Sequence, residues 1–136
     1  MNNVFAIILF AALMWPFGSS GKEYQMQANN SVPAANGTVN AKMDKDNHDT
    51  KIDIKVNNLA SPSSLSPSES VYIVWVKPTG VPPVKKGAIG LDNNLKGELN
   101  VVTTAKDFEV FVTGEPGVSV TEPSGPEVLK AHVKLG

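Results

Sequence analysis

The run Val71-Tyr72-Ile73-Val74-Trp75-Val76 decides the fold class of this chain. It is apolar on both of its faces, which is typical of a central strand covered on both sides. A turn rich in Pro and Gly follows at 78–83, and residues 84–91 are predicted to return as a neighbouring strand. We therefore expect the run to lie at the heart of a β-sheet core.

Two stretches before this run alternate apolar and polar residues with the period of half-buried strands. Their apolar positions are Val39, Ala41 and Met43 in the first stretch and Ile52, Ile54 and Val56 in the second. The connecting residues 44–49 are rich in Asp and Asn, which favour turns. The pattern predicts a hairpin with one solvent-facing side. The Ser- and Pro-rich segment 59–70 is interpreted as a long crossover from one sheet to another.

The remainder of the chain continues the alternation, in stretches 95–101, 108–112 and 129–135, with a short strand predicted at Val118 and Val120. Turn signals recur about every 8 to 12 residues and no helical stripe is present. This predicts an all-β fold, an antiparallel immunoglobulin-like β-sandwich of about seven to nine strands. A barrel is the alternative.

Composition limits the function classes. The 136 residues fit one domain, and 12 Lys and Arg stand against 13 Asp and Glu. This balance argues against a nucleic-acid binder, which normally carries a clustered basic excess. Because there is no cysteine, disulfides, thiolate nucleophiles and thiolate zinc sites are excluded.

The N-terminus differs from the rest of the chain. Residues 4–15 form an unbroken apolar run that would span roughly 18 Å as a helix, short of the roughly 30 Å core of a bilayer. Small residues at 18–21 suit a cleavage zone, although no basic residue precedes the run. We interpret 1–21 as a cleaved secretory signal. An uncleaved anchor formed by 4–17, a mis-called start codon and a buried strand are alternatives.

The remaining chain is divided into an extended polar leader and the sandwich domain. The leader, 22–37, contains few apolar residues and has room for a short first strand at 24–28. The β-sandwich domain is predicted to occupy 38–136.

The segment from Val71 to the C-terminus resembles the extracytoplasmic C-terminal domain of bacterial anti-sigma-K-type factors. The resemblance rests on the stretches 71–76, 87–91, 94–99, 108–116 and 122–126. A full anti-sigma factor of that kind has a sigma-binding region and a membrane helix before this domain, whereas only Met1, Asn2 and Asn3 precede the apolar run here. The resemblance implies an exported version of the outer domain, with no catalytic residues to transfer.

The acidic stretch Asp44-Lys45-Asp46-Asn47-His48-Asp49 raises the possibility of calcium binding, because three carboxylates lie within six residues. The EF-hand pattern requires an oxygen ligand at position 5, Gly at 6 and Glu at 12, where this chain has His48, Asp49 and Lys55. The preferred interpretation is a solvated hairpin tip, and no metal site is predicted.

The two histidines, His48 and His132, are the only candidate bases for Ser-His-Asp chemistry. His132 is expected on the solvent side of the last strand, and Ser124-Gly125 lies in a Pro-flanked turn without a Gly-x-Ser-x-Gly elbow around it. We therefore predict no catalytic residues and no cofactor. A small hydrolase is a distant alternative.

Three aromatic residues bear on the core. Tyr72 and Trp75 are expected on opposite faces of their strand, and Trp75 is predicted to fill the core between the sheets with its indole N–H bonded to a backbone carbonyl. Phe111 is out of phase with its neighbours and is predicted to be buried under a second sheet face. The tripeptides 29–31 and 36–38 match the glycosylation pattern and are assigned no role.

These features predict an exported, non-catalytic binding or structural module of the bacterial cell envelope, periplasmic or secreted. Its working surface is expected on a sheet face or at the turns of one end. An envelope protein or a glycan is the expected partner, with no nucleic acid, and with membrane contact only through the N-terminal segment. The alternative is a regulatory or sensory domain related to anti-sigma factors and anchored to the inner membrane by residues 4–17.

Overall fold

The computed structural model describes residues 21–135, and this part of the chain is all-β. It has nine strands: β1 (Lys22–Gln25), β2 (Gln27–Ala28), β3 (Asn36–Met43), β4 (Thr50–Asn57), β5 (Val71–Pro78), β6 (Val84–Ile89), β7 (Gly97–Thr103), β8 (Asp107–Glu115) and β9 (Glu127–Lys134). The all-β prediction is confirmed.

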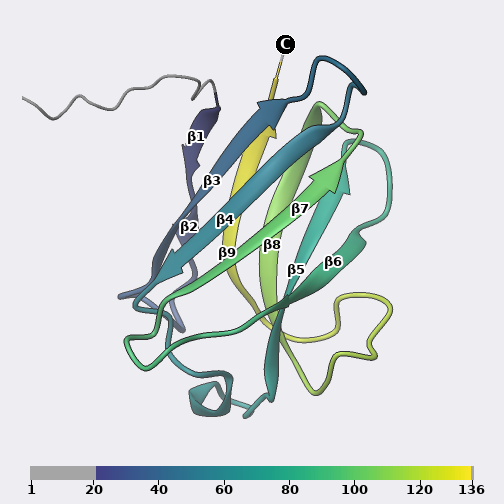
Figure 1. The fold of residues 1–136 in the computed structure, drawn as a ribbon. Helices are drawn as coiled ribbons and strands as arrows, with labels where there is room; N and C mark the ends of the chain where they lie inside the picture. The colour runs from purple at the N-terminus through teal and green to yellow at the C-terminus, as the bar shows by residue number, and fades with distance from the viewer. Residues whose placement is uncertain (1–20, 136) are drawn as a thin grey trace, which may run out of the picture.

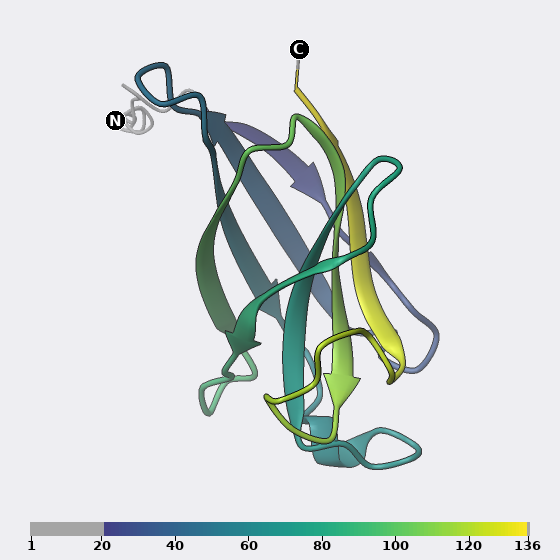
Figure 2. The same ribbon diagram turned by 90° about the vertical axis from the view of Figure 1, so that its right-hand side faces the viewer.

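The strands form two antiparallel sheets that lie face to face (Figures 1 and 2). Sheet A has the order β1-β3-β4-β7, and sheet B has the order β2-β9-β8-β5-β6. The predicted crossover leads from β4 in sheet A to β5 in sheet B, and contains the short 3₁₀ helix η3 (Pro62–Ser64). The two-layer arrangement is that of a β-sandwich.

The inner faces of the sheets form the main core, as the alternating pattern predicts. Val39 of β3 lies opposite Ile54 of β4, and both are fully buried. Val74 of β5 and Val110 of β8 cover them from sheet B within the same apolar cluster. Since apolar burial contributes about 25 cal/mol per Å², this cluster is the main source of stability.

The segment 22–37 was expected as a polar leader before the sandwich, and it proves to be part of both sheets. β1 pairs with β3, and β2 pairs with β9. Met26, between β1 and β2, is buried together with Val32 and Ala35. The segment is extended as expected, but three isolated apolar side chains are enough to attach it to the core, a signal too sparse for a periodicity argument.

The strand predicted at Val118 and Val120 is wrong. These residues lie in the connection between β8 and β9 and have no strand partner. Their carbonyl oxygens accept hydrogen bonds from Nζ of Lys85, each at 2.8 Å. Apolar residues do alternate here, but there are only two of them. Their carbonyl groups are hydrogen-bonded by the side chain of Lys85 in β6 and not by the backbone of a neighbouring strand.

The predicted signal or anchor, 1–21, lies almost wholly outside the described residues. Within 21–135, no helix has the length and apolar character needed to cross a membrane.

Candidate functional site

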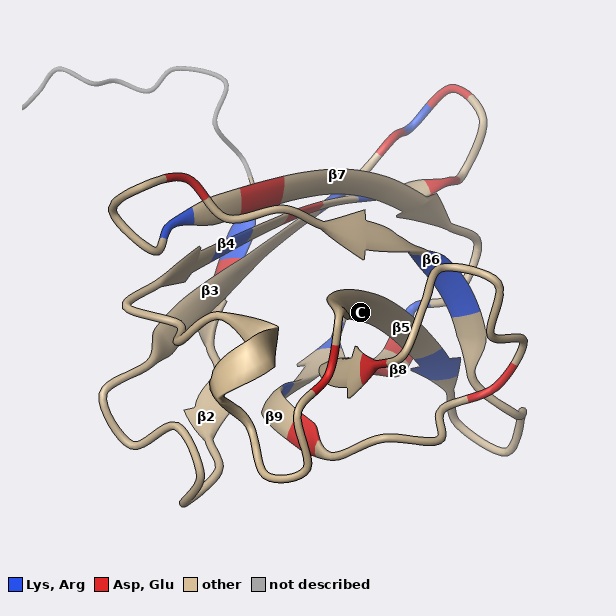
Figure 3. Cartoon of the chain, turned by 90° about the horizontal axis from the view of Figure 1, so that it is seen from below, with Lys and Arg blue, Asp and Glu red and all other residues tan. Residues whose placement is uncertain are grey.

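The outer face of sheet A carries polar side chains in two cross-strand rows. Because the core residues of β3 and β4 point inward, the alternate residues point to solvent. Asn40, Asp53 and Asn100 lie directly opposite one another on β3, β4 and β7, and we call these three residues the amide-acid row. The next row along is Thr38, Lys55 and Glu98. Figure 3 shows basic and acidic positions side by side on β4 and β7.

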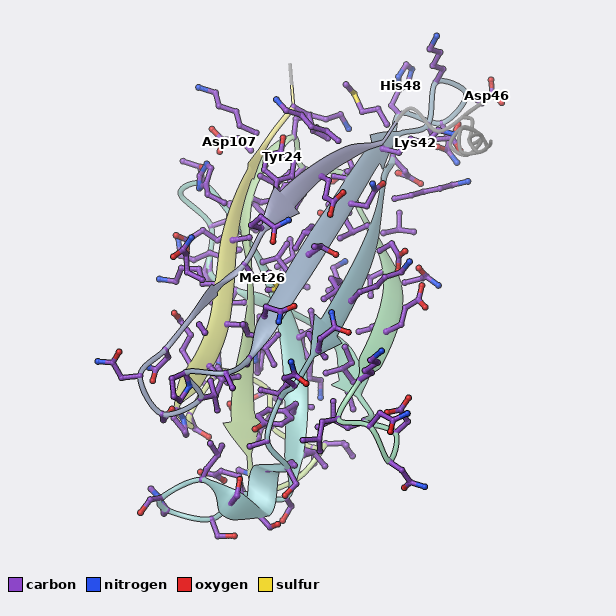
Figure 4. The ribbon with its side chains drawn as sticks, turned by 90° about the vertical axis from the view of Figure 1, so that its left-hand side faces the viewer. Tyr24, Met26, Lys42, Asp46, His48 and Asp107 are labelled. Atoms are coloured by element: carbon purple, nitrogen blue, oxygen red, sulfur yellow. The ribbon has the colours of Figure 1, made fainter. Side chains whose placement is uncertain are left out.

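A hollow of about 320 Å³ lies over the amide-acid row, and we call it the sheet A hollow. It is lined by Asn40, Lys42, Lys51, Ile52, Asp53, Asn100, Val101 and Val102. A larger depression of about 680 Å³ adjoins the second row and includes Lys55 and Glu98. Figure 4 shows Lys42 near the hairpin tip that carries Asp46 and His48. The polar groups and the apolar lining together have the character of a ligand site.

Asp53 is the unusual residue of this surface. Its Oδ1 atom is buried and has no hydrogen-bond partner in the described part of the chain, while its Oδ2 atom lies 3.9 Å from Nζ of Lys55. Burial and the neighbouring carboxyl of Glu98 raise the pKa of Asp53, and Lys55 opposes them. Keeping Asp53 ionised therefore costs free energy in the folded protein. Such a group is more typical of a functional position than of a structural one.

The hairpin tip 44–49 uses its acidic groups locally. Oδ1 of Asp44 accepts the amide of Asp46 at 2.9 Å, and Oδ2 of Asp44 lies 3.6 Å from Nζ of Lys51. The Asp46 amide, helped by Lys51, holds the pKa of Asp44 below its ordinary value against a smaller desolvation effect. Between residues 21 and 135, no three His, Asp or Glu side chains converge as metal ligands.

His132 projects from the outer face of sheet B, where its Nε2 lies 2.8 Å from Oδ1 of Asp107. Both side chains are exposed, as predicted for His132. His48 lies in the hairpin tip with a positive φ of 62°, and its carbonyl accepts Nζ of Lys106. No serine hydroxyl of the described residues is hydrogen-bonded to either imidazole, so the Ser-His-Asp arrangement is not assembled among them.

Trp75 does not fill the core between the sheets, contrary to prediction. It is fully buried with Ile73 and Phe111 in a second cluster, on the outer face of sheet B, which we call the outer aromatic cluster. Its Nε1 donates to Oγ1 of Thr113 at 2.8 Å, not to a backbone carbonyl. The predicted burial of Phe111 is confirmed. Because β5 is apolar on both faces, its side chains pack into two clusters, and the larger of its two aromatic residues, Trp75, lies in the outer one.

Tyr72 occupies the inner face that was assigned to Trp75. It is buried in the main core, and its hydroxyl donates to the carbonyl of Ala60 at 2.6 Å. Burial raises the pKa of Tyr72 to about 12. The predicted placement of Tyr72 and Trp75 on opposite faces is therefore confirmed, but the side chain in the core between the sheets is that of Tyr72 and not that of Trp75.

A buried carboxylate, Glu115, explains what covers the outer aromatic cluster. Its oxygens accept hydrogen bonds from the Thr113 hydroxyl (2.6 Å), the Ser124 amide (3.1 Å), the Ser124 hydroxyl (2.5 Å) and the Gly125 amide (3.2 Å). These bonds hold the connection 116–126, which folds back beside the end of β8 (Figure 1). Val120 of this connection packs against the cluster. We call residues 116–126 the strap.

Sequence reasoning missed the role of Glu115. Ser124-Gly125 was interpreted only as part of a Pro-flanked turn, yet the backbone amides of both residues donate to the carboxylate. The available signal was the phase of β8: Thr113 and Glu115 share the outward phase of Phe111, which was predicted to be buried. An acid in phase with a buried aromatic requires partners.

No protein-family model matches this chain, and no curated protein matches it.

Proposed function

We propose that the protein is an exported, non-catalytic binding module of the bacterial cell envelope that acts through the outer face of sheet A and needs no cofactor. The observation that carries the proposal is Asp53, whose buried and unpartnered oxygen lies between Asn40 and Asn100 on a rigid sheet. When a fold retains an energetically unfavourable charge in a surface hollow, that charge is more typical of a binding position than of a structural one.

The surface is suited to binding rather than to a reaction. The side chains of the amide-acid row project from paired strands, so their spacing is set by the sheet and not by a loop. An amide is neither a nucleophile nor a general base at neutral pH. The His132–Asp107 pair is on the other sheet, in an exposed position that offers no exclusion of water.

The immunoglobulin-like character and the relation to anti-sigma outer domains belong to the proposal. Support comes from the sheet order, since β9-β8-β5 and β1-β3-β4-β7 take the positions of the two immunoglobulin sheets GFC and ABED. The connections differ in more than one place. β4, in the position of strand E, follows β3 and leads to β5 in the position of strand C, and β7, in the position of strand D, leads directly to β8 in the position of strand F. The proposed relation is therefore one of architecture with changed connections.

Export is tested by the state of the N-terminus. We expect the mature protein to begin near Lys22 and to be released with the soluble periplasmic or secreted fraction. Mass spectrometry of the protein recovered from each cell fraction makes the measurement. An intact Met1 in the membrane fraction would contradict cleavage and would favour the membrane-anchored regulatory alternative.

A further inference from the structure

We propose that the sheet A hollow binds a neutral glycan, with Asn40, Asp53 and Asn100 holding the sugar hydroxyls. This inference rests on the proposed function and names the ligand class of the same surface.

The chemistry of the amide-acid row matches that of hydroxyl groups. Each sugar hydroxyl is at once a donor and an acceptor, and an Asn side chain offers both an acceptor oxygen and donor N–H groups. Asp53 supplies an acceptor, because its side chain is 32% exposed, although its Oδ1 atom is itself buried and without a partner within residues 21–135. A hydroxyl donated to this carboxylate would form a charge-assisted bond, the stronger kind. The row therefore presents acceptor and donor groups in the alternation that a polyol requires.

The dimensions of the hollow suit a short saccharide. Neighbouring strands lie about 4.8 Å apart, so three side chains in one row span about 10 Å, the reach of a disaccharide. The volume of about 320 Å³ is at the lower end of small-molecule sites, which run from about 300 to 1,000 Å³. Val102 lies on the same outer face and is 46% exposed, whereas Ile52 and Val101 line the hollow from strands whose side chains at these positions pack into the main core. The aliphatic side chain of Val102 is suited to the C–H face of a sugar ring.

The charges around the hollow favour a neutral ligand over an anionic or a cationic one. Lys42 and Lys51 lie on one side, and the carboxyls of Asp53 and Glu98 lie close to each other on the other, with Lys55 beside Asp53. An anion would meet both carboxyls, and a cation would meet both lysines. A peptide is disfavoured because added strands bind at sheet edges, and the hollow lies over the face of β3, β4 and β7.

The test is a titration of the protein, purified from its native cell fraction, with cellotetraose, laminaritetraose, maltotetraose, mannotetraose and tetra-N-acetylchitotetraose. Calorimetry gives the affinity, and NMR amide shifts in isotope-labelled protein locate the site. At least one of these sugars is expected to bind with a dissociation constant of about 0.1–1 mM and to shift the amides of Asn40, Asp53 and Asn100. If none produces shifts at about 10 mM, ten times the weakest expected constant, the glycan assignment is overturned.

The variant Asp53→Asn separates binding from folding. It keeps the shape of the side chain and removes a charge that is held at a cost, so the protein is expected to stay folded and to be no less stable at neutral pH. The affinity for the sugar is expected to fall at least tenfold. The matched control Asp107→Asn removes a carboxylate from the outer face of sheet B and should leave affinity unchanged. Unchanged affinity in Asp53→Asn would also overturn the inference.

Failure of this inference is distinguishable from failure of the proposed function. If the sugars do not bind but the protein still associates with the envelope through sheet A, the binding module stands and its partner is not a neutral glycan. If association with the envelope is independent of sheet A, the proposed function itself fails.

Discussion

Replacing Trp75 with alanine is expected to destabilise the protein by about 3–5 kcal/mol. The side chain is fully buried, it forms the outer aromatic cluster with Ile73 and Phe111, and its indole N–H bonds Thr113. Truncation therefore leaves a cavity between sheet B and the strap and removes a buried hydrogen bond. Urea unfolding followed by circular dichroism measures the change.

The variant Trp75→Phe provides the control. It retains most of the apolar contact and loses the indole donor, so we expect a smaller cost of about 1–2 kcal/mol. A Trp75→Ala cost below about 0.5 kcal/mol, the range of surface substitutions, would mean that the strap does not bury this residue in solution.

Replacing Glu115 with alanine is expected to cost about 3 kcal/mol, because four donors in and beside the strap lose their common acceptor. Limited proteolysis should then cut within 116–126, where we expect the wild-type protein to be protected. Glu115→Gln is the matched control: it keeps the shape and one acceptor oxygen, so a smaller loss of stability is expected. Equal losses for both variants would show that charge alone matters, and no loss in either would contradict the anchoring role.

The same residue gives stability a pH dependence. Burial raises the pKa of Glu115, but the hydrogen bonds from Ser124, Thr113 and the amide of Gly125 outweigh it and hold the pKa below its ordinary value. A depressed carboxyl pKa contributes stability that is present above the unfolded value of 4.5 and is lost as the pH falls through the folded value. Urea unfolding below about pH 4.5 should therefore show a steeper loss of stability in wild type than in Glu115→Gln.

The strands could be predicted from the sequence where a long alternation carries the information. The hairpin of β3 and β4 repeats an apolar residue every second position, and burial of one face fixes both its register and its orientation. The predicted pairing of 71–76 with 84–91 is likewise seen between β5 and β6. Periodicity does not indicate which of two buried faces is the inner one. For this reason the inner face was assigned to Trp75, whereas Tyr72 lies there.

The surface on which the candidate site lies could be predicted from the sequence, but the residues that form the site could not. The alternation of apolar and polar residues predicts a solvent-facing side on the hairpin, and Asn40 and Asp53 do lie there. Asn100 lies beside Asp53 because β7 pairs with β4. This strand order is not contained in local sequence patterns. The buried and unpartnered oxygen of Asp53 is likewise a property of the folded surface alone.

Cosedimentation with the isolated cell envelope tests the central claim most directly. Wild-type protein, the double variant Asn40→Ala/Asn100→Ala on sheet A, and the control Glu109→Ala on the outer face of sheet B are each purified from the native cell fraction and compared in equal amounts. The account predicts that wild type and Glu109→Ala sediment with the envelope, while the double variant stays folded and loses affinity about tenfold or more, the effect of about 1.4 kcal/mol in binding. Sedimentation of the double variant to the same extent as wild type would contradict the account.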